Sequence, residues 1–138
     1  MILDASVLIS AFFPDEAQPQ AQSVLRAHAA GHERLKAPAL IAYEVTNAVW
    51  QAERRGRISG SQADGILQAA SGLDIELLPY QWGESLPLAR RFNRSAYDAA
   101  YLALAEARGE TMITADERLY NAVRSKLKWV LWLGDYAE

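Results

Sequence analysis

The apolar residues of the chain fall into short continuous runs that alternate with longer amphipathic segments. Runs of this length and continuity are typical of parallel strands, because such strands are covered on both faces of the sheet. We therefore expect five buried strands, at ILD (2–4), LKAP (35–38), IELLP (75–79), TMIT (111–114) and WVLWL (129–133).

The segments between these runs are predicted to be helical, and glycine or proline marks several of their ends. Pro14 stops the first helix, Gly31 and Gly56 end the second and third, and Pro38 suits a first helical turn. The expected helices cover residues 5–13, 16–30, 38–56, 61–71, 82–92, 95–109 and 117–127. Strands that alternate with helices predict an α/β domain with a mainly parallel sheet.

Length and composition narrow the class of protein. With 138 residues and no linker or repeat, a single domain over 1–138 is expected. A hydrophobic content of 51% with 22% charged residues is ordinary for a globular protein. The absence of cysteine excludes disulfides and thiolate metal sites, and there are only two histidines. Any metal ion must then be held mainly by oxygen, which suits Mg²⁺ or Mn²⁺.

Charge and hydropathy give a weaker indication of location and partners. No segment reaches the roughly 20 apolar residues that span a membrane, and no basic stretch precedes the first apolar run. We therefore expect a cytoplasmic protein without a membrane partner. The net charge of −3 does not show whether the protein binds nucleic acid, because the rest of the chain is slightly positive once four acidic residues in apolar surroundings are set aside.

These four acids, Asp4, Glu44, Asp98 and Asp116, lie in apolar surroundings, where a lone charge is costly to bury. Asp4 closes the first expected strand and Asp116 lies just past the fourth. Both are therefore placed at the carboxyl edge of the sheet, where parallel sheets form their functional crevice. Glu44 and Asp98 lie near the starts of their helices, and the sequence leaves open whether those helices begin at the same edge.

Each acid also has a purely structural interpretation. Asp98 follows Ser95 in a capping-box pattern, and Asp4 is placed to cap the first helix. Either Asp116 or Thr114 is placed to cap the helix at 117, and Glu44 to lie on a solvated helix face. A helix cap stabilises a protein by about 1 kcal/mol.

Convergence of the four carboxylates predicts a different role. Two charges about 4 Å apart repel by about 4 kcal/mol at an effective dielectric of about 20, so several such pairs outweigh the caps. Glu44 shares a helical face with Asn47 beside apolar residues, and Asp98 precedes small alanines that allow close approach. Such a cluster needs a cation or raised pKa values. Mg²⁺ or Mn²⁺ held by carboxylates supports phosphodiester hydrolysis.

Over nearly its whole length the chain resembles a PIN-domain protein of the VapC-type toxin ribonucleases. MILDASVLI resembles the opening strand with its first acid, Asp4, and the hydroxyl of Ser6. PALIAYEVTNAV resembles the second motif, with Glu44 and Asn47. SAYDAAYLALAEARGETMITADERL resembles the third and fourth motifs, with Asp98, Thr114 and Asp116.

The resemblance implies a three-layer α/β/α sandwich with a five-stranded sheet in the order 3-2-1-4-5. It implies an Mg²⁺- or Mn²⁺-dependent endoribonuclease acting on single-stranded or loop RNA, a homodimer, and inhibition by a cognate antitoxin of a toxin–antitoxin pair. Asp4, Asp98 and Asp116 then ligate the metal, and Glu44 ligates a second ion or orients water. The hydroxyls of Ser6 and Thr114 support them, as does the neighbouring Asn47. Where some relatives carry a further acid, Asn121 is neutral here.

Two arginine clusters are candidates for RNA contact. ERRGR supplies Arg54, Arg55 and Arg57, for which a solvated helix end is the favoured interpretation, and RRFNR supplies Arg90, Arg91 and Arg94 beside the third acid. Aromatic residues near the site, Tyr97 and Tyr101, are predicted to pack in the core rather than to stack on bases. Trp129 and Trp132 in the last strand are also predicted to be core.

Other functions fit the sequence less well. Haloacid-type phosphatases need a second Asp at the position of Ser6, and the expected first strand ends in Asp4 alone, without the acidic pair that receiver domains need before their phosphorylated Asp. Two alternatives within the resemblance stay open. One is a non-catalytic PIN-like module that binds RNA or protein, and the other is a PIN nuclease of RNA processing without an antitoxin.

Overall fold

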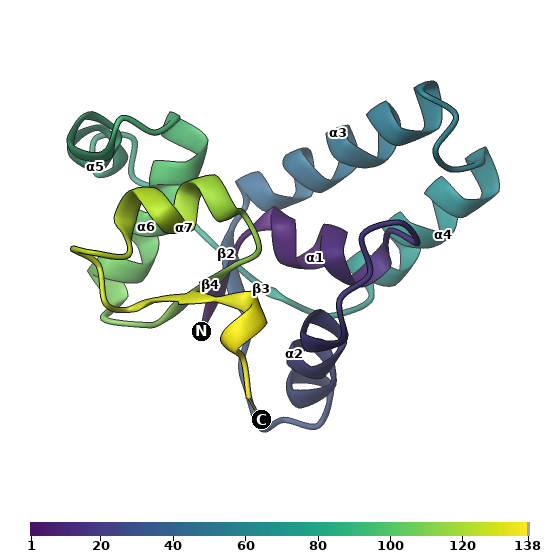
Figure 1. Cartoon of the computed structure of the whole chain (residues 1–138), viewed down its shortest axis with the longest axis horizontal. Coiled ribbons are helices and arrows are strands. Elements are labelled where there is room, and N and C mark those ends of the chain that lie inside the picture. The colour runs from purple at the N-terminus through teal and green to yellow at the C-terminus, as the bar shows by residue number, and fades with distance from the viewer. Residues whose placement is uncertain (138) are drawn as a thin grey trace.

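Five short strands form the centre of the fold in a computed structural model that describes residues 1–137. The strands are β1 (Ile2–Leu3), β2 (Lys36–Pro38), β3 (Glu76–Leu78), β4 (Met112–Thr114) and β5 (Val130–Trp132). All neighbours pair in parallel, in the order β3-β2-β1-β4-β5 (Figure 1). The predicted fold class and strand order are confirmed.

The central pair of strands, β1 and β4, lies in the deepest part of the core. Ile2 pairs with Met112 and Leu3 with Ile113, and all four side chains are fully buried. Burial on both faces explains why these strands are continuously apolar in the sequence. The register also places the residues that follow β1 and β4 side by side at the carboxyl edge of the sheet.

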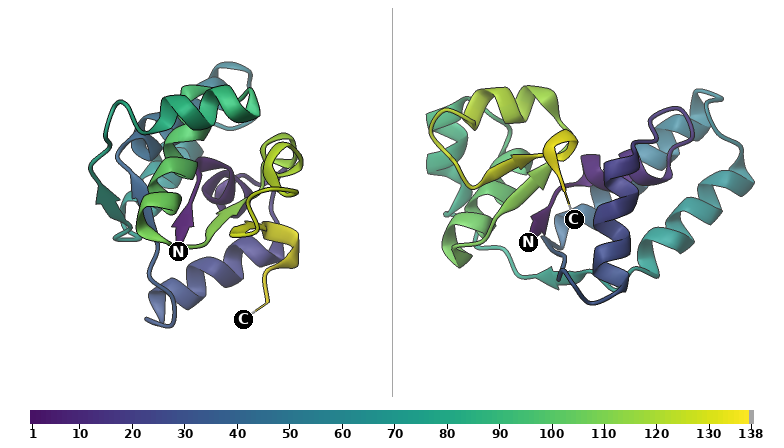
Figure 2. Two further views of the ribbon diagram at one scale, coloured as in Figure 1. Left: turned by 90° about the vertical axis from the view of Figure 1, so that its left-hand side faces the viewer. Right: turned by 60° about the horizontal axis from the view of Figure 1, so that its bottom comes forward.

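Helices cover both sides of the sheet. They are α1 (Ala5–Phe12), α2 (Pro19–Ala29), α3 (Leu40–Arg54), α4 (Gly60–Ser71), α5 (Ser85–Phe92), α6 (Ala96–Arg108) and α7 (Glu117–Val123), followed by a short 3₁₀ turn, η1 (Leu133–Asp135). Connections from β1 to β2 and from β3 to β4 run in opposite directions across the sheet, so right-handed crossovers place their helices on opposite faces. Figure 2 shows β1 between α6 on one side and α2 on the other.

Two helix pairs extend from this sandwich. α3 and α4 pack side by side at one end of the molecule, and α5 packs along α6 near the other (Figures 1 and 2). No helix among residues 1–137 is long and apolar enough to cross a membrane.

Some predicted boundaries and burial assignments are wrong. Pro38 ends β2 and pairs with Leu78, so α3 begins only at Leu40. The last helix ends at Val123, four residues before the predicted end. Trp129 is only partly buried against the core, and Trp132 is half-buried against Tyr120, with ring centroids 5.6 Å apart.

An ion-pair network around Glu110 joins the start of β2 to the segment between α6 and β4. Its carboxylate accepts hydrogen bonds from Lys36 Nζ at 2.7 Å, Arg108 Nε at 2.9 Å and the terminal ammonium of Met1 at 3.0 Å. Burial raises the pKa of Glu110, but these hydrogen bonds outweigh burial and lower the pKa from 4.5 to about 2. The charged form is therefore favoured in the folded state.

Glu110→Gln is expected to lower the melting temperature at pH 7 by roughly 2–6 °C, because about 1 kcal/mol of ion pairing is lost. Because the pKa of Glu110 is lower in the folded state, its charged form stabilises the folded protein at pH values above 4.5. The difference in melting temperature between the variant and wild type should therefore shrink as pH falls from 4.5 towards about 2. Thermal unfolding followed by circular dichroism across this range measures both effects. The exposed Glu106→Gln on α6 is the control, and an equal loss in both variants would exclude the network as the cause.

Candidate functional site

Asp4 is the most deeply buried of the four predicted acids. It directly follows β1, is only 5% exposed, and its backbone N–H donates to the carbonyl of Ile113 in the middle of β4. The same residue is the N-cap of α1, since Oδ1 accepts a hydrogen bond from Ser6 N at 3.0 Å. The strand-to-helix turn therefore fixes the carboxylate at the carboxyl edge of the sheet.

Two hydroxyls hold this carboxylate from both sides. Ser6 Oγ donates to Asp4 Oδ1, and Thr114 Oγ1 donates to Asp4 Oδ2. Each hydroxyl also accepts a backbone hydrogen bond, Ser6 Oγ from Ala115 N at 2.8 Å and Thr114 Oγ1 from Asp116 N at 3.0 Å. Ser6 and Thr114 thus connect the ends of β1 and β4 around Asp4.

Burial dominates the electrostatics of Asp4. It raises the pKa of the carboxyl from 3.8 to about 7, against the opposing effect of the hydrogen bonds from Ser6 and Thr114. The negative charges of Asp116 and Asp98 are smaller contributions to the same rise. The group therefore titrates near neutral pH and responds to two of the other predicted acids.

Removing the Thr114 hydroxyl should disturb Asp4 and also leave the backbone N–H of Asp116 without its acceptor. Thr114→Val is nearly isosteric, deletes one of the two side-chain donors to Asp4, and should lower catalytic activity about 10- to 100-fold. Thr114→Ser keeps a hydroxyl at this buried position and is the matched control, which should stay within about threefold of wild type. Initial rates on one RNA measure both variants, and equal rates for the valine variant and wild type would contradict a supporting role.

Glu44 is held by a residue from a distant part of the chain. Tyr101 on α6 is 2% exposed, and its hydroxyl donates to Glu44 Oε1 on α3 at 2.6 Å. Burial raises the pKa of Glu44, the Tyr101 hydrogen bond opposes this, and the charge of Asp98 adds to the rise. The interpretation of Glu44 as a solvated residue is therefore wrong, because the carboxylate is half-buried and bonded.

Asp98 lies in the first turn of α6 and pairs with a preceding arginine. Ser95 caps the helix by accepting the Asp98 N–H at 3.1 Å, as the capping pattern predicted. The Asp98 side chain instead accepts from Arg94, with Nε and Nη2 at 3.1 and 3.0 Å from Oδ2. Burial raises the pKa of Asp98, the Arg94 pairing opposes this, and Asp116 raises it further.

Asp116 caps α7. Its Oδ1 accepts the backbone N–H groups of Arg118 and Leu119 at 2.9 and 3.1 Å. Asp4 and Asp116 therefore cap helices as the structural interpretation predicted, and both also contribute charge to the same cluster. The two interpretations weighed for them in the sequence are compatible.

The four acids form one electrostatic cluster at the carboxyl edge. The charges of Asp98 and Asp116 act on Asp4, that of Asp116 acts on Asp98, and that of Asp98 acts on Glu44. Among residues 1–137, however, no three His, Asp or Glu side chains are arranged to hold a metal ion. The all-oxygen chemistry of the donors and the raised pKa values fit a divalent cation, and metal binding itself stays a prediction.

The other predicted residues differ in how the structure places them. Asn47 is exposed, one turn along α3 from Glu44. Arg90 and Arg91 are exposed in the last turn of α5, while Arg94 is engaged with Asp98. Arg57, from the ERRGR segment, forms ion pairs with Asp15 and Glu16, which is consistent with a structural role.

Two contacts of the site were not predicted from the sequence. Tyr101 was correctly predicted to be buried, but its hydrogen bond to Glu44 joins residues that are 57 positions apart. Arg94 was considered only as an RNA contact, although its spacing of four residues from Asp98 was an available signal for a pair.

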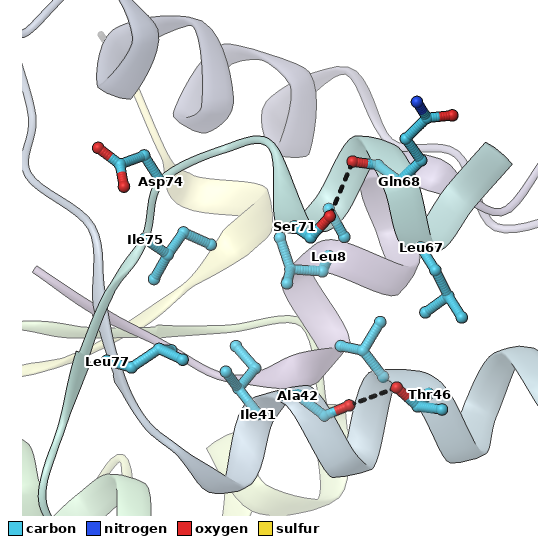
Figure 3. Close-up of a pocket in the computed structure, with 12 residues that line it drawn as sticks. Leu8, Ile41, Ala42, Thr46, Leu67, Gln68, Ser71, Asp74, Ile75 and Leu77 are labelled. Atoms are coloured by element: carbon cyan, nitrogen blue, oxygen red, sulfur yellow. Dashed lines mark hydrogen bonds between the residues drawn. The ribbon is translucent and has the colours of Figure 1, made fainter. Parts of the chain in front are cut away.

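An apolar groove lies apart from the acids (Figure 3). It has a volume of about 510 Å³ and is lined by residues of α1, α3, α4 and β3, including Leu8, Ile41 and Leu77. Its hydroxyls on α3 and α4, Thr46 and Ser71, donate to carbonyls of their own helices. The groove therefore offers mainly apolar contact and is not the site of the predicted chemistry.

Comparisons with known proteins agree with this geometry. The PIN domain family matches residues 1–124. Ribonuclease VapC3 of Pyrobaculum aerophilum is 33% identical over 123 residues, which cover 86% of this chain and 91% of that protein. Ribonuclease VapC9 of Mycobacterium tuberculosis is 32% identical over 119 residues, covering 86% and 87% respectively.

A solved structure matches almost the whole fold. The crystal structure of PAE2754 from Pyrobaculum aerophilum has a TM-score of 0.72 to this chain and covers 96% of it, or 90% of that chain. Sequence identity is 24%, so this likeness supports the fold alone.

Proposed function

Because the chain belongs to the PIN-domain family, we propose that it is a VapC-type endoribonuclease that hydrolyses RNA with Mg²⁺ or Mn²⁺. Its preferred substrate is single-stranded or loop RNA, and it acts as the toxin of a toxin–antitoxin pair. Relatives named as VapC ribonucleases over most of their length support the activity.

The observation that carries this proposal is the environment of Asp4. Asp4 is 5% exposed, and burial, with smaller contributions from the charges of Asp116 and Asp98, raises its pKa to about 7, so its charged form is costly to the fold. Its position at the carboxyl edge, next to three other acids, gives that cost a catalytic explanation.

Asp4, Asp98 and Asp116 are the residues that would hold the metal ion, with Glu44 beside them. A bound divalent ion would stabilise the clustered charges, activate a water molecule and polarise the scissile phosphate. Hydrolysis of the phosphodiester bond would leave a 3′-hydroxyl and a 5′-phosphate.

The chain's own residues prepare the carboxylates for this task. Ser6 and Thr114 fix the orientation of Asp4, and the N-terminus of α7 fixes that of Asp116. Tyr101 holds Glu44 against the core, and Arg94 holds Asp98. These contacts restrain the carboxylates before substrate arrives, which reduces the entropic cost of assembling the site, but no three acids among residues 1–137 are yet arranged to hold a metal ion.

The partners in this proposal rest on the relatives. A cognate antitoxin is inferred from their naming as VapC ribonucleases, and the homodimer and the cytoplasmic location stay predictions. Co-expression with a candidate antitoxin followed by size-exclusion chromatography with light scattering would measure both the complex and the number of copies.

The chemistry of the product ends tests the proposed reaction. Cleavage of a defined RNA by the purified protein should give 5′-phosphate ends, which polynucleotide kinase labels only after phosphatase treatment. The partner fragments should carry 3′-hydroxyls that poly(A) polymerase extends. Fragments with 2′,3′-cyclic phosphates would contradict the proposal, because they arise from attack by the RNA's own 2′-hydroxyl.

A further inference from the structure

Tyr97 is a large aromatic side chain that the fold leaves in solvent beside the acidic cluster. It is 61% exposed, whereas Tyr101, one turn further along α6, is 2% exposed. The sequence-based expectation that both pack in the core is therefore correct for Tyr101 and wrong for Tyr97. Tyr97 immediately precedes Asp98, so the exposed ring is carried by the first turn of α6, next in sequence to a site acid.

Two exposed arginines precede Tyr97 at the end of the neighbouring helix. Arg90 and Arg91 are exposed in the last turn of α5, and the chain then turns through Asn93, which has a left-handed φ of 49°. α6 begins at Ala96, and its long packing against α5 keeps the two helices together. One short corner, residues 90–98, thus brings together an aromatic ring, two exposed guanidinium groups and a site acid.

The three arginines of this corner have different tasks. Arg94 forms a bifurcated ion pair with Asp98, so its charge is used within the site. Arg90 and Arg91 form no ion pair among residues 1–137 that would hold them from a ligand, although Arg91 lies 4.8 Å over the ring of Phe92. The positive charge that no ion pair uses therefore lies at the end of α5, which packs against the helix that carries Tyr97.

We propose that Tyr97 stacks on an unpaired base of the substrate while Arg90 and Arg91 contact the neighbouring phosphates. This inference deepens the proposed ribonuclease function and rests on it. Aromatic rings interleaved with basic residues are how proteins bind single strands, and stacking requires a base whose face is free. Bases in a duplex are covered on both faces, so this corner selects single-stranded RNA or a loop.

Binding in the absence of cleavage tests the proposal. Every protein carries Asp4→Asn, and its affinity for a fluorescein-labelled 12-nucleotide single strand, and for the same strand in a blunt duplex, is measured by fluorescence anisotropy. Tyr97→Ala should weaken single-strand binding about 5- to 150-fold, the range for the loss of one stacked base. Duplex binding should change less than twofold.

Two further variants test whether the aromatic ring at this position is responsible for the loss. Tyr97→Phe keeps the ring and should bind within twofold of the parent. Tyr43→Ala removes a 77% exposed tyrosine that also directly precedes a site acid but has Arg34 and Arg54 as its nearest arginines in sequence, and it should also stay within twofold. Equal losses in Tyr97→Ala and Tyr43→Ala, or a loss in Tyr97→Phe, would overturn the stacking role.

The remaining outcomes distinguish this inference from the function on which it rests. If the parent binds and the wild type cleaves RNA, but Tyr97→Ala binds normally, only the stacking role fails. If the parent binds neither oligonucleotide and the wild type cleaves nothing, the proposed function fails as well. If Tyr97→Ala changes the elution volume in size-exclusion chromatography together with its affinity, the ring serves contact between copies, and the proposal is overturned.

Discussion

Replacing Asp4 with asparagine is expected to stabilise the folded protein while it abolishes RNA cleavage. Burial raises the pKa of Asp4 from 3.8 to about 7, so the fold disfavours the charged form. Each pKa unit corresponds to about 1.4 kcal/mol, which makes the cost of the charge up to about 4 kcal/mol above pH 7. Asparagine has almost the same shape and an acceptor for Ser6 N–H, but no charge.

The sign of the pH dependence follows from this shift. Because the folded state binds the Asp4 proton more tightly than the unfolded state, the cost is absent below pH 3.8 and grows as pH rises to about 7. The stability advantage of Asp4→Asn over wild type should therefore increase from pH 5 to pH 8. Urea unfolding in EDTA at these two pH values measures it.

A matched variant shows whether the effect belongs to the site. Asp64→Asn changes an exposed acid on α4 and should alter stability by less than about 0.5 kcal/mol at either pH. Cleavage by Asp4→Asn should fall at least about 100-fold. Replacing a residue that only hydrogen-bonds to a metal ligand already lowers activity by up to about 100-fold, and Asp4 is a proposed ligand itself. An asparagine variant that is less stable than wild type at both pH values would contradict the electrostatic account of Asp4.

Manganese is expected to raise the melting temperature of the wild-type protein by roughly 10 °C. A ligand at 100 times its dissociation constant stabilises by about 2.7 kcal/mol, and a domain of this size converts that energy into a shift of this order. The physical reason is that the cation offsets the repulsion among Asp4, Asp98 and Asp116. Differential scanning fluorimetry over a manganese titration measures the shift.

Variants of the cluster should lose most of this shift. Asp98→Asn removes one proposed ligand and should require a much higher manganese concentration for the same melting temperature. Glu106→Gln, an exposed acid later on the same helix, should respond like wild type. Equal shifts in both variants would place the manganese elsewhere on the protein.

β3 was expected to be buried and is mostly exposed, with Leu77 at 51%, but the central strands could be predicted because burial on both faces leaves a clear mark on the sequence. Ile2, Leu3, Met112 and Ile113 are continuously apolar for that reason. The family resemblance supplied the order, and the paired register of β1 and β4 explains why Asp4 and Thr114 meet. Helix ends were harder, since Pro38 suits both a strand end and a first helical turn.

Local patterns also predicted which backbone groups the site residues would satisfy. Ser95, Asp4 and Asp116 all cap helices, and each cap depends on residues only two or three positions away. A capping pattern therefore did not exclude a functional role. In Asp4 and Asp116 the cap is the means by which the fold fixes a carboxylate at the edge of the sheet.

The rest of the site depends on contacts that local patterns do not encode. The Glu44–Tyr101 hydrogen bond exists only after α3 and α6 are placed beside the sheet. Tyr97 and Tyr101 occupy one helix four positions apart, yet one is exposed and the other buried. The difference arises because Tyr97 lies in the first turn of α6, beyond the cover that the core gives Tyr101.

The most direct test of the central claim is the opening of a circular single-stranded RNA, which has no ends for an exonuclease. Wild-type protein is assayed with manganese and with EDTA, and Asp4→Asn is assayed with manganese. Linear product is expected only for the wild type with manganese. Equal product in EDTA, or with Asp4→Asn, would contradict a metal-dependent nuclease site built around Asp4.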